Sequence, residues 1–263
     1  MKQRFNYHSH TKRCGHAGGE DEAYVQAAIQ QGYQRMGFSD HAPYINGYDP
    51  QERMKVEELE EYIQSIEYLQ TKYQDQIEIF KGLEIEWIPE RIEELKKYRQ
   101  MFDYIILGEH TYTLDIENYF YDHVSDDDIL LYANMIAQAC DAHIADIIAH
   151  PDLFMYGKKE FNEACVQASH MIVQAAIRND IILEVNLNGL KYGKVQMGDE
   201  LRYLYPYRGF WEIASQYDCK VIYGLDAHAP SKYQDDKAYE IVQQEIIYDL
   251  PLHFIDDLNF PHK

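Results

Sequence analysis

The sequence has few cysteines, no long apolar run and a shortage of basic residues. Its four cysteines, at positions 14, 140, 165 and 219, are scattered and form no CxxC pair, which excludes a disulfide-rich secreted scaffold and indicates reduced thiols. No apolar stretch approaches the roughly 20 residues of a membrane span, and no secretory apolar segment follows Met1. We therefore expect a cytoplasmic protein with no membrane association.

The charge balance is strongly acidic. There are 24 Lys and Arg against 45 Asp and Glu, which gives a formal net charge of −21. Such a surface repels anionic membranes and nucleic-acid backbones, whose binding depends on neutralisation of phosphates by Lys and Arg. We therefore expect no nucleic-acid partner. Bound divalent cations would reverse the local charge at a site, so an anionic substrate is compatible with this composition.

The length and patterning favour one domain over residues 1–263, with no particular oligomeric state indicated. Strand-like apolar runs begin roughly every 25 to 45 residues with helical patterns between them, as in repeated βα units. No linker rich in Pro, Gly or Ser and no shift in composition marks a boundary. The predicted helical stretches are 22–31, 56–73, 126–143, 159–178, 208–216 and 236–247.

Seven short apolar runs end in histidines or acids, and this recurrence is the most informative pattern in the chain. Runs that are apolar throughout are typical of strands buried on both faces of a parallel sheet. In an α/β barrel, the active-site groups follow the C-terminal ends of such strands. The closing groups are His8 and His10, Asp40 and His41, Glu84, His110, His150 and Asp152, Glu184 and Asn186, and Asp226 and His228. The sequence therefore predicts a barrel with a ring of imidazoles and carboxylates at one mouth, which a cluster of divalent metals requires.

The spacing within these groups suits metal coordination. On a strand, residues i and i+2 share a face, so His8 and His10 can bind one ion. Asp226 and His228 have the same spacing. A carboxylate such as Glu84 has two oxygens and can bridge two cations.

The loop after the first run offers two further candidate ligands. His16 lies among glycines at positions 15, 18 and 19 and could fold back over the mouth. Cys14 lies between the candidate histidines and could be a soft ligand or only a reduced thiol.

Together these motifs resemble the polymerase-and-histidinol-phosphatase (PHP) superfamily of metal-dependent phosphoesterases. The size of the chain and the segment 184–190 look most like the stand-alone histidinol-phosphate phosphatases of that superfamily. The resemblance implies an α/β fold, a distorted (β/α)7 TIM-like barrel called the PHP fold, with a trinuclear metal site. The motifs that carry it are His8-x-His10, Asp40-His41, Gly82-Leu83-Glu84, Gly108-x-His110, His150-Pro151-Asp152, Glu184-x-Asn186 and Asp226-x-His228.

The same resemblance implies nine metal ligands and up to three divalent ions. We expect Zn, Mn or Fe, because mixed histidine and carboxylate ligands suit all three metals. The ligand types alone do not distinguish among them. The implied sets are His8, His10, Glu84 and Asp226 for the first ion, Glu84, His110 and His150 for the second, and His16, His41 and His228 for the third.

The expected reaction is hydrolysis of a phosphate monoester by water. Bound cations would neutralise the phosphoryl oxygens and lower the pKa of the attacking water. The candidates that could protonate the leaving alkoxide are Asp40, Asp152 and His228. The candidates that could bind the phosphate are Lys158, Lys191, Arg202 and Arg208.

The resemblance makes L-histidinol phosphate, an intermediate of histidine synthesis, the expected small anionic substrate. Lys158, Lys159 and Lys191 stand near places where such enzymes have phosphate-gripping arginines, and lysine cannot make the bidentate contact of arginine. Another small phosphate ester or a nucleotide is therefore the alternative substrate. A non-catalytic metal-binding module is a third hypothesis, but it predicts broken ligand sets, and none is broken.

Overall fold

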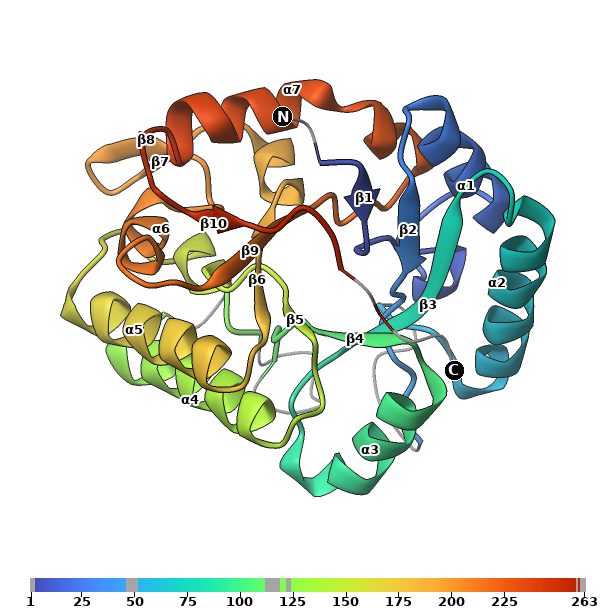
Figure 1. Ribbon diagram of the computed structural model, residues 1–263. Helices are drawn as coiled ribbons and strands as arrows, with labels where there is room; N and C mark the ends of the chain where they lie inside the picture. The colour runs from blue at the N-terminus through green and yellow to red at the C-terminus, as the bar shows by residue number, and fades with distance from the viewer. Residues whose placement is uncertain (1–2, 46–51, 112–118, 122–123, 259, 261–263) are drawn as a thin grey trace.

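A curled parallel sheet forms the centre of the molecule. The structure is a computed structural model that describes residues 3–45, 52–111, 119–121, 124–258 and 260. Within these residues the sheet has eight strands in the order β1-β2-β3-β4-β5-β6-β9-β10, and helices surround it (Figure 1). Every neighbouring pair in this sheet is parallel. The predicted TIM-like α/β barrel is confirmed.

Seven of the eight described strands of the parallel sheet coincide with the predicted apolar runs. The eighth, β10 (His253–Phe254), pairs with the start of β9 and was not predicted, because two residues are too short for a periodic signal. The connection between β6 and β9 also forms an unpredicted antiparallel hairpin of β7 (Val195–Met197) and β8 (Glu200–Arg202). The predicted strands are β1 (Phe5–Asn6), β2 (Arg35–Phe38), β3 (Glu78–Ile85), β4 (Tyr104–Leu107), β5 (Ile147–Ile148), β6 (Ile182–Asn186) and β9 (Lys220–Gly224).

The described helices are α1 (Asp21–Gln30), α2 (Leu59–Tyr73), α3 (Ile92–Met101), α4 (Asp126–Asp141), α5 (Glu163–Arg178), α6 (Arg208–Ala214) and α7 (Asp236–Ile241). All but α3 fall within the predicted stretches, give or take a residue. A capping box begins α4, since the Ser125 hydroxyl accepts from the Asp128 N–H and the Asp128 carboxylate from the Ser125 N–H. None of the described helices is both long and apolar enough to cross a membrane.

Shorter helical turns lie in the connections. Three of them follow strands at the mouth of the barrel: η1 (Lys12–Cys14), η4 (Leu153–Tyr156) and η5 (Asn188–Tyr192). The others are η2 (Val56–Glu58), η3 (Pro89–Arg91), η6 (Pro230–Gln234) and the π-helical η7 (Val242–Ile246).

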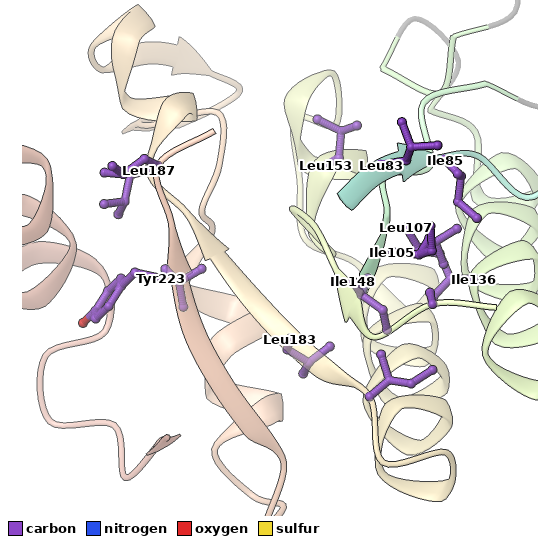
Figure 2. Packing of buried hydrophobic residues seen from close by; sticks show 14 of the residues in the cluster. Leu83, Ile85, Ile105, Leu107, Ile136, Ile148, Leu153, Leu183, Leu187 and Tyr223 are labelled. Atoms are coloured by element: carbon purple, nitrogen blue, oxygen red, sulfur yellow. The ribbon is translucent and has the colours of Figure 1, made fainter. Parts of the chain in front are cut away.

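Side chains of the strands alternate between the barrel interior and the helices. On β4, Ile105 and Leu107 pack outward into the layer that includes Ile136 of α4, as Figure 2 shows. Tyr104 and Ile106 of the same strand face the interior. We call the buried interior residues the inner cluster; they are Phe5, Tyr7, Phe80, Tyr104, Ile106, Ile147, Ala149, Ile182 and Ile222. Further along β3 and β6, the inward positions are occupied by acids instead.

The barrel is joined at its mouth and plugged at its other end. After β1 and β9 the chain pairs directly, since the His10 N–H donates to the Ala227 carbonyl at 2.9 Å. At the opposite end, the ring of Phe260 stacks on Tyr104 with centroids 4.9 Å apart and meets Tyr7 edge-on at 5.0 Å. The segment that follows β10 crosses the barrel to reach this position (Figure 1). The closed end of the barrel is therefore opposite the mouth at which the strands end.

Candidate active site

All nine predicted ligands converge at the mouth of the barrel. All but His16 lie at or just beyond the C-terminal end of a strand, where the carboxyl ends of parallel strands meet. His16 lies further along, in the loop that follows η1. Backbone pairing extends into the site, because His41 and Glu84 form a parallel bridge beyond β2. The ligands come after β1 (His8, His10 and His16), β2 (His41), β4 (His110), β5 (His150) and β9 (Asp226 and His228), and from β3 itself (Glu84).

Four of these side chains aim their donor atoms at one point. Nε2 of His8 lies 3.1 Å from Nε2 of His10 and 3.3 Å from Oε2 of Glu84. Nε2 of His10 lies 3.3 Å from the same oxygen and 3.2 Å from Oδ1 of Asp226. Ligands about 2.0 Å from a tetrahedral ion are about 3.3 Å from one another. The donor atoms therefore have the spacing that a divalent ion such as zinc requires.

Glu84 faces two further histidines with its other oxygen. Oε1 lies 3.3 Å from Nε2 of His150 and 3.9 Å from Nε2 of His110. This oxygen is buried and has no hydrogen-bond partner within the described part of the chain. A carboxylate with one oxygen toward His8 and His10 and the other toward this pair has the geometry to bridge two ions.

Hydrogen bonds to the outer ring nitrogens direct the inner nitrogens toward the site. Nδ1 of His8 lies 2.9 and 3.0 Å from the Glu184 carboxylate oxygens and donates to them. Nδ1 of His16 and of His228 donate to backbone carbonyls at 3.1 and 3.0 Å. These bonds place the ring proton on Nδ1 and leave a lone pair on Nε2, which is the usual arrangement for a metal-ligating histidine.

The facing Nε2 atoms of His16 and His228 also fit a cation. These atoms are 2.9 Å apart, and both rings already donate through Nδ1. At this distance the two nitrogens need either a proton on one of them or a metal cation beside both. Nitrogen atoms of His10, His41 and His228 also lie within 4.8 Å of one another. The donor set therefore fits a second and a third cation beside the first.

Two glycines make room for the buried acids. A Cβ atom at Gly108 would lie 1.8 Å from Oε1 of Glu84, and one at Gly224 would lie 2.0 Å from Oε2 of Glu184. Any side chain at either position would displace the carboxylate. The space that each carboxylate occupies thus explains why a glycine stands just before the polar residues that follow β4 and β9.

Electrostatics in the cluster favour positive charge at its centre. Burial alone would lower the pKa of His8, but the carboxylates of Glu184, Asp226 and Glu84 outweigh it and raise that pKa well above its usual value. Burial, together with the nearby His228, lowers the pKa of His10 to about 3, so this imidazole is neutral and able to act as a ligand. The acids thus attract a cation to a site that has a neutral nitrogen ready to coordinate it.

A cavity of about 300 Å³ lies above the ligands and reaches the surface. This volume is at the lower end of the range of small-molecule sites, which suits a small ester. Among the described residues that line it, the only lysine and arginine are Lys191 and Arg53. Lys191 is exposed and was predicted to bind phosphate; it makes no ion pair within the described part of the chain.

The other three phosphate-binding candidates lie outside this cavity. Lys158 pairs with Asp126 at 2.7 Å. Arg202 is buried and donates to four backbone carbonyls, at 2.5 to 3.1 Å. Arg208 pairs with Glu212 at 2.7 Å. Their cationic groups are committed to these partners, and the geometry gives the predicted role no support.

Of the three candidate proton donors, only His228 lines the cavity. Asp40 is buried and accepts hydrogen bonds from the backbone N–H and the hydroxyl of Thr11. Asp152 is buried and accepts from the Tyr207 N–H at 2.6 Å. Burial raises the pKa of both carboxyls to about 7, but each faces the protein interior. Their positions indicate that they fix loops at the mouth.

A buried ion pair behind His110 escaped sequence reasoning. The Glu86 carboxylate accepts hydrogen bonds from both terminal guanidinium nitrogens of Arg53, at 2.9 and 3.0 Å. One of its oxygens also lies 3.3 Å from Nδ1 of His110. Burial would raise the pKa of Glu86, but Arg53 and His110 lower it to about 2, so the carboxylate stays ionised. The i, i+2 spacing of Glu84 and Glu86 could have indicated that Glu86 points to the same side as Glu84. No local signal connects Arg53 to it.

Comparison with known proteins finds relatives of this sequence. The family model described as PHP domain matches residues 6–188. A relative from Deinococcus radiodurans, described as a probable histidinol-phosphatase, is 28% identical over 236 residues, which is 86% of each chain. The histidinol-phosphatase of Bacillus subtilis is 31% identical over 118 residues, or 41% of this chain and 44% of the relative.

A solved structure shares the fold over almost the whole chain. It is histidinol phosphate phosphatase from Lactococcus lactis in complex with zinc, L-histidinol and phosphate. The two structures superpose with a TM-score of 0.74 at 17% identity, over 96% of this chain and 95% of the other. At this identity the likeness concerns the fold.

Proposed function

The chain belongs to the PHP domain family, and from this premise we propose that it is a metal-dependent phosphatase that hydrolyses L-histidinol phosphate to L-histidinol and phosphate. The observation that carries the proposal is the convergence of imidazole and carboxylate donors, at the spacing of a tetrahedral metal site, beneath a cavity of about 300 Å³. The names of the relatives from Deinococcus radiodurans and Bacillus subtilis support the substrate.

We assign the nine side chains to up to three divalent ions, Zn, Mn or Fe. When bound, the ions would neutralise the phosphate oxygens and lower the pKa of the attacking water. The sets that the resemblance implies are His8, His10, Glu84 and Asp226; Glu84, His110 and His150; and His16, His41 and His228. The distances support the first two sets and the pairing of His16 with His228. The nitrogen of His41 also lies close to donor atoms of Glu84 and His110, so this residue could belong to the second set instead.

The protein's own groups orient this chemistry. Glu184 fixes the ring of His8, and the Arg53–Glu86 pair fixes that of His110. Lys191 at the cavity is the cation that attracts the phosphate dianion. His228 can protonate the leaving alkoxide only when its Nε2 is not a ligand, so occupancy of the third position decides between its two roles.

The test is a comparison of purified protein, supplied with Zn or Mn, on a panel of phosphate esters. The panel contains L-histidinol phosphate, p-nitrophenyl phosphate, small aliphatic esters and nucleotides. We expect the highest kcat/KM with L-histidinol phosphate and no turnover in a Glu84→Gln variant prepared in parallel, which controls for contaminating phosphatases. A kcat/KM no better than that of p-nitrophenyl phosphate would transfer the proposal to another small phosphate ester or a nucleotide.

A further inference from the structure

One side of the cavity is lined by tyrosines that the proposed chemistry does not use. The described lining includes five of them, at positions 119, 121, 156, 192 and 205, which we call the tyrosine wall. Tyr156 is at its centre, with ring centroids 5.3 Å from Tyr121, 5.6 Å from Tyr192 and 6.3 Å from Tyr205. Tyr205 in turn lies 6.1 Å from the ring of His150. The wall is thus a continuous set of rings that begins beside a predicted metal ligand.

The segment that contributes Tyr119 and Tyr121 is anchored to the site. Tyr119 pairs with Thr111 in an antiparallel bridge, and the rings of Tyr119 and Tyr121 stack with centroids 4.8 Å apart. Phe120 points the other way, is buried and packs edge-on against Tyr132 at 5.0 Å. Its N–H donates to the carbonyl of His110 at 2.8 Å. The two tyrosines are therefore fixed to the backbone of a predicted ligand.

Glycines in the two neighbouring loops leave space for the wall. A Cβ atom at Gly189 would lie 2.2 Å from the carbonyl oxygen of Tyr205 and 2.7 Å from its ring. A Cβ atom at Gly157 would lie 2.4 Å from the carbonyl oxygen of Tyr121. Loops after β4, β5 and β6 can approach one another only because these positions lack side chains. The wall is thus a packed surface with defined shape.

The wall and the metal cluster have different chemistry. The cluster offers donors for cations that would bind the phosphate. Aromatic rings stack on flat rings and attract cations to their faces, and tyrosine brings no positive charge for a phosphate. We propose that the tyrosine wall is the subsite for the alcohol half of the substrate and selects esters that have a flat ring with cationic character, such as imidazole. This inference rests on the proposed function in that the phosphate is seated on the metal cluster.

The central ring supplies the test. We compare Tyr156→Leu, which removes the ring, with Tyr156→Phe, which keeps it, and with Tyr68→Leu on the exposed face of α2 as a control. The readout is kcat/KM for L-histidinol phosphate relative to ethanolamine phosphate and glycerol phosphate, which lack a ring. We expect this ratio to fall by about 3- to 10-fold in Tyr156→Leu only. An equal loss on all three esters would overturn the subsite.

Binding of L-histidinol provides a readout that needs no turnover. It contains the ring and the amine but no phosphate, and calorimetry on the protein as purified reports its affinity. We expect Tyr156→Leu to weaken this affinity by a similar factor, and unchanged affinity would overturn the wall. If wild-type protein binds L-histidinol in a ring-dependent way but cleaves no phosphate ester, the proposed function fails and the wall stands.

A second position guards against a folding defect. If Tyr156→Leu does not fold, Tyr192→Leu replaces it, because that side chain is 45% exposed. The Tyr192 ring also contacts Lys191, whose Nζ lies 5.0 Å from the ring centroid, and the ratio between esters cancels an effect of this lysine on phosphate binding. A fall in the same ratio supports the wall, and no change in both the ratio and the affinity refutes it.

Discussion

The two ends of the barrel interior are built from the same strands but differ in polarity: one is apolar and packed, and the other holds buried acids and imidazoles. Toward the plugged end, Phe80 and Tyr104 pack with the ring of Phe260 in an apolar interior. A few residues along, at the mouth, Glu84 occupies an inward position of the strand that contains Phe80. The plugged end is filled by packed apolar side chains, whereas the mouth holds buried oxygens and nitrogens that have no hydrogen-bond partner among the described residues. Stability and chemistry are thus separated along the barrel axis.

Removal of metal should have the largest effect on the mouth of the barrel and none on the packing at the plugged end. Treatment with a chelator leaves the carboxylates and imidazoles of the mouth facing one another without cations, so we expect phosphatase activity to disappear and to return when Zn or Mn is added. Elemental analysis of active protein should find up to three divalent ions per chain. Full activity in protein that contains only traces of metal would contradict the assignment.

Glu84→Gln should have the largest effect of any single substitution. It keeps the size of the side chain but removes the negative charge from the group that faces five histidines at 3.3 to 3.9 Å. Because loss of an outer-shell partner alone costs 10- to 100-fold, we expect kcat/KM to fall by more than about 100-fold. Metal content should fall with it. A variant with normal metal content and activity would show that Glu84 does not bridge ions.

Phe80→Ala should act on the plugged end alone. Phe80 is buried between Tyr7 and Phe260, so its truncation leaves a cavity and should lower the free energy of unfolding by about 3 to 5 kcal/mol. Chemical denaturation measures this loss. We expect kcat/KM of the folded protein to stay close to that of the wild type, and a large fall would mean that the two ends are coupled.

A matched pair of lysines gives the smallest expected effect. Lys191→Met removes the cation at the cavity, and Lys158→Met removes one that pairs with Asp126 outside it. We expect the first to raise KM for the phosphate ester several-fold, as for loss of one exposed charge that steers an anion, and the second to leave it unchanged. Equal effects would return Lys158 to the list of phosphate-binding groups.

How much the sequence predicted depends on how closely each residue follows a strand. His8, Glu84 and Asp226 come at or just after apolar runs, and the geometry of a parallel barrel then brings them together. Arg53 and the tyrosine wall come from long connections whose paths no local pattern describes. Arg202 lies in such a connection too, where the β7–β8 hairpin turns it toward backbone carbonyls instead of the cavity. The sequence thus predicted the residues at the carboxyl ends of the strands. It did not predict which side chains of the long connections face the cavity.

The plug at the closed end also concerns the order in which the barrel can assemble. The hydroxyl of Tyr7 donates to the carbonyl of Leu258, a contact between residues 251 positions apart. Phe260 stacks on Tyr104 of β4 and meets Tyr7, just beyond β1, edge-on. During synthesis, β1 leaves the ribosome long before the segment that covers it exists. Until then the aromatic side of the inner cluster faces water, and such distant contacts form late and slowly. The inner cluster is therefore without its cover until the segment that contains Leu258 and Phe260 has been made.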